Sequence, residues 1–265
     1  MSNIAVTHAP SGLVRATVLR TERVTPNMVR VTIGGDDLGR YEYQGFDQWF
    51  RLALPVDQST SFEGMPQRFG IGGYLKYLTL PKTSRPAIRN YTVRAFRPAS
   101  RELDIDFVSH GDEGIAGPWA AAVEPGAEVA FIDQGCGWAP VPSDWVLLVA
   151  DESGLPAVAG ILRDLPRDAV GHAIIELFDE ADRQDVGAPS GVEVHWLVRE
   201  AGTDPGSAAL RALEALEFPA GSPYAFAVGE QALAAGARRH LVQGRGVPKQ
   251  HVTFSGYWKR GVAAR

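Results

Sequence analysis

The first half of the chain alternates short apolar or β-branched runs with turn residues. Apolar side chains recur at about every second position between glycines and prolines, a pattern typical of antiparallel strands. It predicts six strands, at residues 13–20, 28–35, 49–55, 89–96, 102–110 and 127–133. Many short strands with little helix favour a barrel or a sandwich. Residues 56–88 form a long, glycine-containing connection, which is typical of binding loops and mobile flaps.

The second half has a different pattern, because buried strands alternate with helices. Residues 145–150, WVLLVA, form a continuous apolar run, as expected for a parallel strand covered on both faces. Helical spacing follows at 155–165, where Pro156 suits a first helical turn. Further strands are predicted at 172–179, 192–200, 223–230 and 252–258, and further helices at 207–218 and 231–243. This alternation indicates a parallel α/β sheet of the nucleotide-binding type.

Glycine and proline gather between these two patterns, in residues 135–144 (GCGWAPVPSD). A length of 265 residues suits one large domain or two small ones. We therefore expect two domains, at residues 1–140 and 141–265.

Composition narrows the class of protein without naming a function. The net charge of −5 argues against a general nucleic-acid binder, which would carry a basic face. The single cysteine, Cys136, excludes an internal disulfide, and it also excludes an iron–sulfur cluster, which needs about four protein ligands. The N-terminus lacks a basic start followed by a long apolar run, and no stretch approaches the roughly 20 apolar residues of a membrane span. We expect a cytoplasmic protein with no membrane span.

The segment RNYTVR, at 89–94, places an aromatic ring between two guanidiniums. In a strand, Arg89 and Tyr91 point to one face and Thr92 to the other. A phenol beside a guanidinium suits a ligand with a flat ring and a phosphate, because the phenol can cover the ring and the guanidinium can bind the phosphate through a forked hydrogen bond. Arginine and tyrosine are also common on edge strands, so a plain surface strand stays open as an alternative.

The stretch DIDFVSHGDEGIAGPWA carries a second candidate surface. Asp106, Val108 and His110 share one strand face by the period of two. The chain then turns through glycines that include Gly114 and Gly117, and a short helix beginning there would offer free N–H groups to an anion. A structural histidine and a plain loop are the alternative interpretations.

The strand at 145–150 is not followed by the usual glycine-rich dinucleotide turn. Asp151 and Glu152 come instead, and two carboxylates there would repel a pyrophosphate. Asp151 either lies beside a ligand or caps the next helix. Glu230 ends a predicted strand at the carboxyl edge, where parallel sheets bind ligands.

The sequence predicts neither a protein-bound metal nor a covalent nucleophile. The histidines, at positions 8, 110, 172, 195, 240 and 251, lack short ligand spacing. No serine lies in a nucleophile elbow.

Four ordered segments resemble one family. RNYTVR matches the pattern R-x-Y-T-x-R, and VSHGDEGIAGPWA, ADESGLPAVAGIL and GYWKRG follow in the same order as in siderophore-interacting proteins, which are flavin-dependent ferric-siderophore reductases. The resemblance runs along nearly the whole chain. It implies a six-stranded antiparallel FAD-binding β-barrel followed by a parallel-sheet α/β domain that binds a nicotinamide nucleotide, as in ferredoxin reductases.

The resemblance also implies roles for individual residues. The residues expected to bind the cofactors are Arg89, Tyr91, Thr92, Asp106, Val108, His110, Gly114, Ala116, Gly117, Asp151, Ser153, Glu230 and Trp258. Among them, Gly114, Ala116 and Gly117 would meet the FAD phosphates, and Asp151 and Ser153 would lie near the flavin edge. Family members often carry serine at the position of Gly117, and Pro118 lacks an N–H donor. A buried Trp258 that packs the last strand is the alternative for that residue.

The implied reaction needs no catalytic acid or base. NADH or NADPH reduces FAD, and FAD reduces the Fe(III) of a ferric siderophore in single-electron steps, so that Fe(II) is released for iron acquisition. We expect Arg51, Lys259 and Arg260 to dock the substrate, and we expect a monomer. The residues 178–184 offer both acids and Arg183, so they do not choose between the two nicotinamides. A general flavin reductase or diaphorase, and a non-catalytic siderophore-binding flavoprotein, remain as alternatives.

Overall fold

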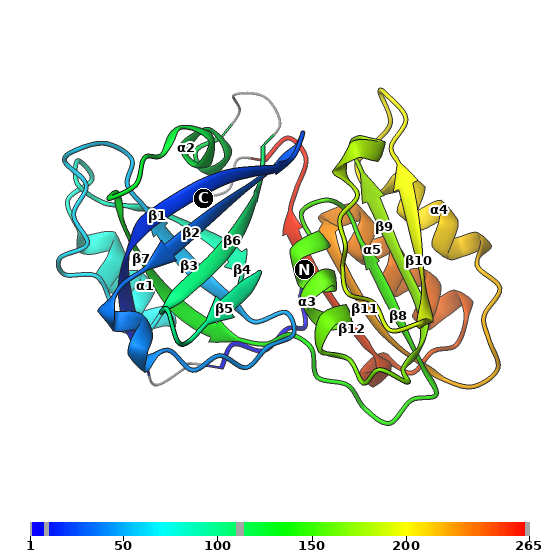
Figure 1. Cartoon of the computed structure of the whole chain (residues 1–265). Coiled ribbons are helices and arrows are strands. Elements are labelled where there is room, and N and C mark those ends of the chain that lie inside the picture. The colour runs from blue at the N-terminus through cyan, green and yellow to red at the C-terminus, as the bar shows by residue number, and fades with distance from the viewer. Residues whose placement is uncertain (1, 8–10, 110–113, 263–265) are drawn as a thin grey trace.

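The computed structural model describes residues 2–7, 11–109 and 114–262, which form two sheets lying side by side (Figure 1). The first sheet holds seven strands in the order β4-β3-β7-β1-β2-β6-β5, and all its pairings are antiparallel. The strands are β1 (Leu13–Thr25), β2 (Met28–Gly34), β3 (Trp49–Leu54), β4 (Ala87–Thr92), β5 (Ala95–Arg97), β6 (Glu102–Val108) and β7 (Glu128–Gly135).

The predicted strand at 89–96 is divided into β4 and β5. The Val93 N–H donates to the Gln48 carbonyl, but the Arg94 N–H donates to the Asp104 carbonyl, so the chain leaves β3 and joins β6 at this point. β4 and β6 lie near opposite ends of the strand order, yet the rings of Tyr91 and Phe107 are only 4.3 Å apart. The sheet therefore curls on itself around an apolar interior, as expected for a barrel-like domain.

The connection at 56–88 contains a helix that its sequence pattern did not predict. This helix, α1 (Ile71–Thr79), follows Phe69, which packs with Phe62 and Met65 against the outer face of the first sheet. A second short helix, α2 (Ala116–Ala122), lies beside β6.

The second sheet has five parallel strands in the order β10-β9-β8-β11-β12. Its strands are β8 (Trp145–Ala150), β9 (Val170–Leu177), β10 (Gly191–Val198), β11 (Pro223–Glu230) and β12 (Val252–Trp258). Helix α3 (Leu155–Asp164) packs on one face, and α4 (Ser207–Ala215) and α5 (Gln231–Arg239) pack on the other. The predicted parallel-sheet α/β class is confirmed. Helices cover both faces of the sheet, and its topological switch point lies between β8 and β11, where such sheets bind ligands.

Two carboxylates link the two domains, and a third binds the segment that connects them. Asp182 accepts hydrogen bonds from the Thr25 hydroxyl and from the backbone and side-chain N–H groups of Asn27. Asp164 accepts from the Phe46 N–H at 2.6 Å, and Asp47 accepts from the N–H groups of residues 137 and 138. Strand β7 ends and β8 begins on either side of the glycine- and proline-rich segment 136–144, within which the proposed boundary at 140/141 falls.

The amino-terminal segment also spans both sheets. The Asn3 N–H donates to the carbonyl of Phe254 on β12, and the Asn3 side-chain oxygen accepts from the Phe254 N–H. Four residues later, the Thr7 N–H donates to the carbonyl of Gln134 on β7. Residues 2–7 therefore form a seam between the last strands of the two sheets.

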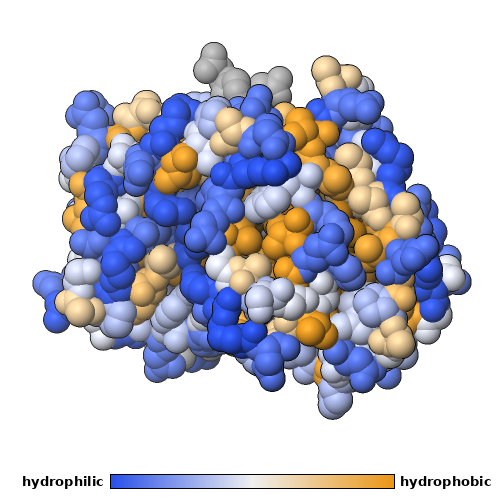
Figure 2. All heavy atoms as spheres, turned by 45° about the vertical axis from the view of Figure 1, so that its right-hand side comes forward, coloured by the Kyte–Doolittle hydropathy of each residue, from blue (hydrophilic) through white to orange (hydrophobic). Residues whose placement is uncertain are grey.

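Hydrophilic residues surround a smaller apolar patch near the middle of the face shown in Figure 2. Across residues 2–7, 11–109 and 114–262, no helix combines the length and apolarity needed to cross a membrane.

Candidate functional site

Strand β4 positions Arg89 and Tyr91 on the same face, opposite Leu52 and Phe50 of β3. Tyr91 is half-buried and its ring rests on Phe107. Burial raises the pKa of the Tyr91 phenol, and the nearby Arg89 charge offsets this only in part, so the phenol stays protonated. Thr92 is buried opposite Trp49 on the other face. The alternation predicted for this segment is therefore present.

Arg89 differs from its neighbouring arginines in having no carboxylate partner. Its guanidinium donates to the Ile88 carbonyl at 2.7 Å, and no ion pair involves it within the described part of the chain. By contrast, Arg94 and Arg97 form ion pairs with carboxylates of β6. A half-buried, unneutralised cation beside a tyrosine ring is suited to an anionic ligand with a flat ring.

Asp106, which was expected to line the cofactor site, binds two arginines. It is only 4% exposed, and Arg30 binds both of its oxygens, at 2.7 and 2.8 Å. Arg94 of the RNYTVR segment approaches the same carboxylate at 3.3 Å. The hydrogen bonds with Asp106 raise the pKa of Arg30. Asp106 thus orients two arginines, and Arg30 is a residue that the sequence pattern did not single out.

The end of β6 and the start of α2 lie in close contact. A Cβ atom on Gly117 would lie 3.1 Å from the Val108 carbonyl oxygen, so glycine allows this approach. Gly114 is exposed with a φ of 84°, whereas Ala116 is buried. His110 lies outside the described residues.

The carboxyl edge of the second sheet brings four predicted site residues together around Asp151. This residue follows β8 and is 0% exposed. Its Oδ1 accepts from the Ser153 N–H at 2.9 Å, from the Ser153 hydroxyl at 2.5 Å and from the Gly154 N–H at 3.2 Å. Its Oδ2 accepts from the Glu230 N–H at 2.6 Å and from Trp258 Nε1 at 3.0 Å. Burial raises the pKa of Asp151, and these donors oppose the rise.

Asp151 therefore ties the ends of three strands to one another. Gly229 permits this, since a Cβ atom there would lie 2.5 Å from Asp151 Oδ1 and its φ is 127°. Glu230 in turn caps α5 by accepting from the Ala232 N–H, and it also accepts from the Arg260 N–H at 3.2 Å. The carboxylate of Glu230 is thus occupied by the backbone.

A buried cluster beside Asp151 was not predicted from the sequence. Arg199 binds Glu152 at 3.2 Å and Glu176 at 3.1 Å, and all three residues lie near the carboxyl ends of β8, β9 and β10. Burial and the charge of Asp151 raise the pKa of Glu152 to about 8, despite Arg199. The expected repulsion of a pyrophosphate by Asp151 and Glu152 is therefore weaker than their sequence suggests, because both side chains are buried and hydrogen-bonded.

The three expected docking cations have different surroundings. Arg51 lies over the Phe69 ring at 4.6 Å, its buried Nε has no hydrogen-bond partner among the described residues, and burial lowers its pKa. Lys259 is exposed and forms no ion pair within that part of the chain, whereas Arg260 pairs with Asp204. The latter two follow β12, whose end lies between the two sheets in Figure 1.

Arg163 links helix α3 to the RNYTVR segment. It donates to the Arg94 carbonyl at 2.8 Å and to the Tyr43 hydroxyl at 2.5 Å. Helix α3 begins just after Asp151, so one rigid element connects the two groups of candidate residues.

Two family models match separate parts of the chain. A family model described as a siderophore-interacting FAD-binding domain matches residues 17–137, and one described as a siderophore-interacting protein matches residues 143–261. The ferric vibriobactin reductase of Vibrio cholerae is 32% identical over 92% of this chain and 88% of its own. The NADPH-dependent ferric-chelate reductase of Escherichia coli is 28% identical over 91% of each chain.

Solved structures give the same result at the level of the fold. A siderophore utilization protein from T. fusca has a TM-score of 0.82 and 35% identity, covering 98% of this chain and 97% of its own. The ferredoxin-NADP+ reductase of Plasmodium falciparum, at 10% identity, shares the fold alone, with a TM-score of 0.58 over 96% and 100% of the two chains.

Proposed function

The chain belongs to the siderophore-interacting protein family, and we propose on that basis that it is an FAD-dependent ferric-siderophore reductase that uses NADH or NADPH. The observation that carries the proposal is the pairing of an unneutralised Arg89 with the half-buried ring of Tyr91. A dinucleotide with an isoalloxazine ring matches both features, because its pyrophosphate is anionic and its ring is flat.

The residues of the first sheet fit FAD. Arg89 would neutralise the pyrophosphate, and the Tyr91 ring, supported from behind by Phe107, would cover the isoalloxazine. Asp106 would keep Arg30 and Arg94 in place around the site. Bound FAD supplies the redox chemistry, accepting hydride from a nicotinamide and giving single electrons to Fe(III).

The second sheet is suited to hold the nicotinamide nucleotide. Asp151 follows β8, and Glu230 is the last residue of β11, so both lie at the topological switch point. Neither residue acts as an acid or a base in the proposal. Asp151 fixes the strand ends through its five hydrogen bonds, and Ser153 and Trp258 border the same edge.

For the ferric siderophore we propose Lys259 as the main docking cation, because it is exposed and unpaired among the described residues. Arg260 would have to leave Asp204, and Arg51 would have to leave Phe69, before either could bind an anionic chelate. We further propose that the protein works in the cytoplasm as a monomer. The name of the Escherichia coli relative favours NADPH as the first donor to test.

The test compares Arg89→Ala with Arg20→Ala after reconstitution with FAD. Arg20 is a suitable control because its side chain is 54% exposed and pairs with Glu102 in the same sheet. The parent protein and the control should be yellow, and the Arg89 variant should be folded by circular dichroism but largely colourless. Full flavin retention by the Arg89 variant would contradict the assignment.

Turnover then separates the candidate activities. Anaerobic addition of NADPH or NADH should bleach the flavin, and a ferric siderophore should restore its colour while a chromogenic Fe(II) chelator reports the product. Faster turnover with quinones or free flavins than with ferric siderophores would favour a general flavin reductase. Flavin binding without bleaching by either nicotinamide would favour a non-catalytic binder.

A further inference from the structure

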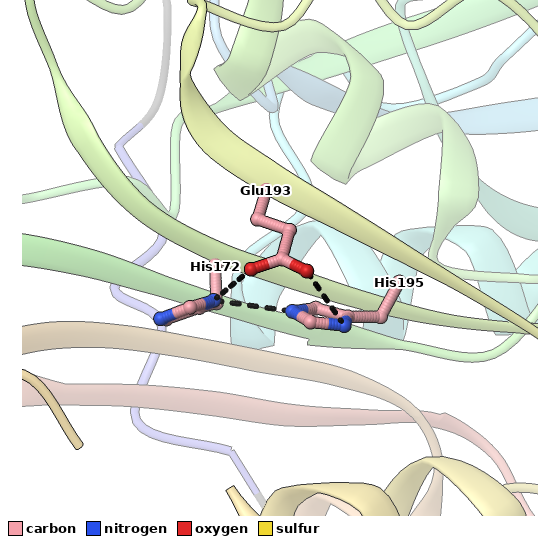
Figure 3. Close-up of side chains that lie close together, drawn as sticks. All are labelled: His172, Glu193 and His195. Atoms are coloured by element: carbon pink, nitrogen blue, oxygen red, sulfur yellow. Dashed lines mark hydrogen bonds and ion pairs between the residues drawn. The ribbon is translucent and has the colours of Figure 1, made fainter. Parts of the chain in front are cut away.

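Two histidines and a glutamate meet on one face of the second sheet, away from the proposed cofactor site. His172 lies on β9, and Glu193 and His195 lie on the neighbouring strand β10. The parallel register places Glu193 opposite His172, and His195 is two residues further along the same face. Figure 3 shows the three side chains turned toward one another.

The ligand atoms of these side chains are already close to the spacing of a metal site. His172 Nδ1 lies 3.1 Å from His195 Nε2 and 3.6 Å from Glu193 Oε2. One ligand atom from each residue can be chosen so that all lie within 4.8 Å of one another. A tetrahedral ion with bonds of about 2.0–2.2 Å holds its ligand atoms roughly 3.3–3.6 Å apart, so small side-chain adjustments would suffice.

We propose that His172, Glu193 and His195 form a binding site for a divalent transition-metal ion of the zinc and ferrous class. Imidazole and carboxylate ligands are the set that Zn²⁺ and Fe²⁺ share, and three protein ligands leave at least one position for water or a small ligand. The inference stands apart from the proposed reductase function, and it opposes our expectation from the sequence that no metal is bound.

The surroundings of the cluster suit an accessible ion. The exposed fractions of the side chains are 15% for His172, 28% for His195 and 67% for Glu193. The two histidines are therefore held by surrounding residues, whereas Glu193 is open to solvent. A cavity of about 250 Å³ reaches His172 and Glu193, with Trp145 and Pro219 in its wall. The rings of Trp145 and His172 are perpendicular, with their centroids 6.0 Å apart.

The site is also separated from the carboxyl edge that would bind the nicotinamide. His172 is the third residue of β9 and Glu193 the third residue of β10, so both lie near the amino ends of their strands. Asp151 and Glu230 lie at the opposite ends of β8 and β11. Loss of the metal ligands should therefore leave flavin binding unchanged.

The experiment titrates Zn²⁺ into metal-stripped, FAD-loaded full-length protein by calorimetry, with anaerobic Fe²⁺ as a second probe. We expect one ion per chain and a rise in thermal midpoint on binding. Glu193→Gln should weaken binding at least about tenfold, and the double variant His172→Ala, His195→Ala should abolish it. The control is His240→Ala, which removes a histidine that contacts Arg245 at the end of α5.

Binding of the parent and all ligand variants with equal affinity would overturn the proposal, as would a stoichiometry well below one. An equal loss in the His240 control would overturn it too, because binding would then be nonspecific. Glu193→Gln keeps the test decisive if the double variant fails to fold, since the Glu193 side chain is largely exposed. Retained yellow colour in each variant shows that the flavin domain is intact.

Discussion

Asp151→Asn is expected to destabilise the second domain, although it changes only one atom. The two carboxylate oxygens of Asp151 accept five hydrogen bonds, three on Oδ1 and two on Oδ2. An asparagine amide must direct its NH₂ group toward one of these two sets of donors. The less costly orientation keeps the three bonds from residues 153 and 154.

That orientation leaves two donors facing the new amide, the buried Glu230 N–H and the half-buried Trp258 indole N–H. Leaving a buried polar group unsatisfied costs about 1–3 kcal/mol each. Removal of a buried charge offsets part of this loss, because burial already raises the pKa of Asp151. We therefore expect the free energy of unfolding to fall by about 2–4 kcal/mol.

Urea denaturation monitored by tryptophan fluorescence and far-ultraviolet circular dichroism measures this change. The matched control is Asp179→Asn, because Asp179 is an exposed cap that accepts one hydrogen bond, from the Ala181 N–H. Asparagine caps as well as aspartate, so the control should change stability by less than about 0.5 kcal/mol. A similarly small loss in the Asp151 variant would refute the view that this carboxylate holds the strand ends together.

Three further predictions concern neighbouring features. The pKa of Glu152 is raised to about 8, so its contribution to stability is present below its ordinary pKa near 4.5 and is lost as pH rises through 8. Glu152→Gln should flatten this fall in the free energy of unfolding, measured by urea denaturation from pH 5 to 9. An unchanged pH dependence of stability in the variant would contradict the prediction. Arg163→Met removes the hydrogen bond to the Arg94 carbonyl and should lower the free energy of unfolding by about 1–3 kcal/mol. Limited proteolysis should then cleave the variant between the domains faster than the parent, and equal protease resistance would contradict the prediction. Gly229→Ala should lower the free energy of unfolding by at least about 2 kcal/mol more than Gly246→Ala, as measured by urea denaturation. Both glycines have a positive φ, but an added Cβ atom would meet another atom within 4 Å only at Gly229. Equal losses in the two variants would contradict the prediction.

Periodicity predicted the fold class because each half of the chain has one dominant repeat. Every strand of the second sheet was predicted close to its observed bounds. The bounds of β8 and β11 match the prediction because both strands are buried throughout and form continuous apolar runs. The split of residues 89–96 was not predicted. It depends on a change of partner from β3 to β6, and that is a tertiary event with no local signal.

Candidate residues were predicted best where they lie at or just after the end of a strand. Asp151, Ser153, Glu230 and Trp258 do meet, because the carboxyl ends of parallel strands share one edge. Their assignment to cofactor binding stays a prediction. The roles of Arg30 and Arg199 could not be inferred, since each is defined by carboxylates distant in sequence. His172 and His195 were overlooked for a related reason, as strand register rather than sequence spacing brings them together.

The seam made by residues 2–7 has a consequence for how the protein matures. Asn3 and Phe254 are 251 positions apart, so their contact cannot form until strand β12 has left the ribosome. Residues 2–7 are therefore synthesised well before the strand that anchors them. A bulky group fused to this segment should hinder the late contact more than one placed within an exposed loop.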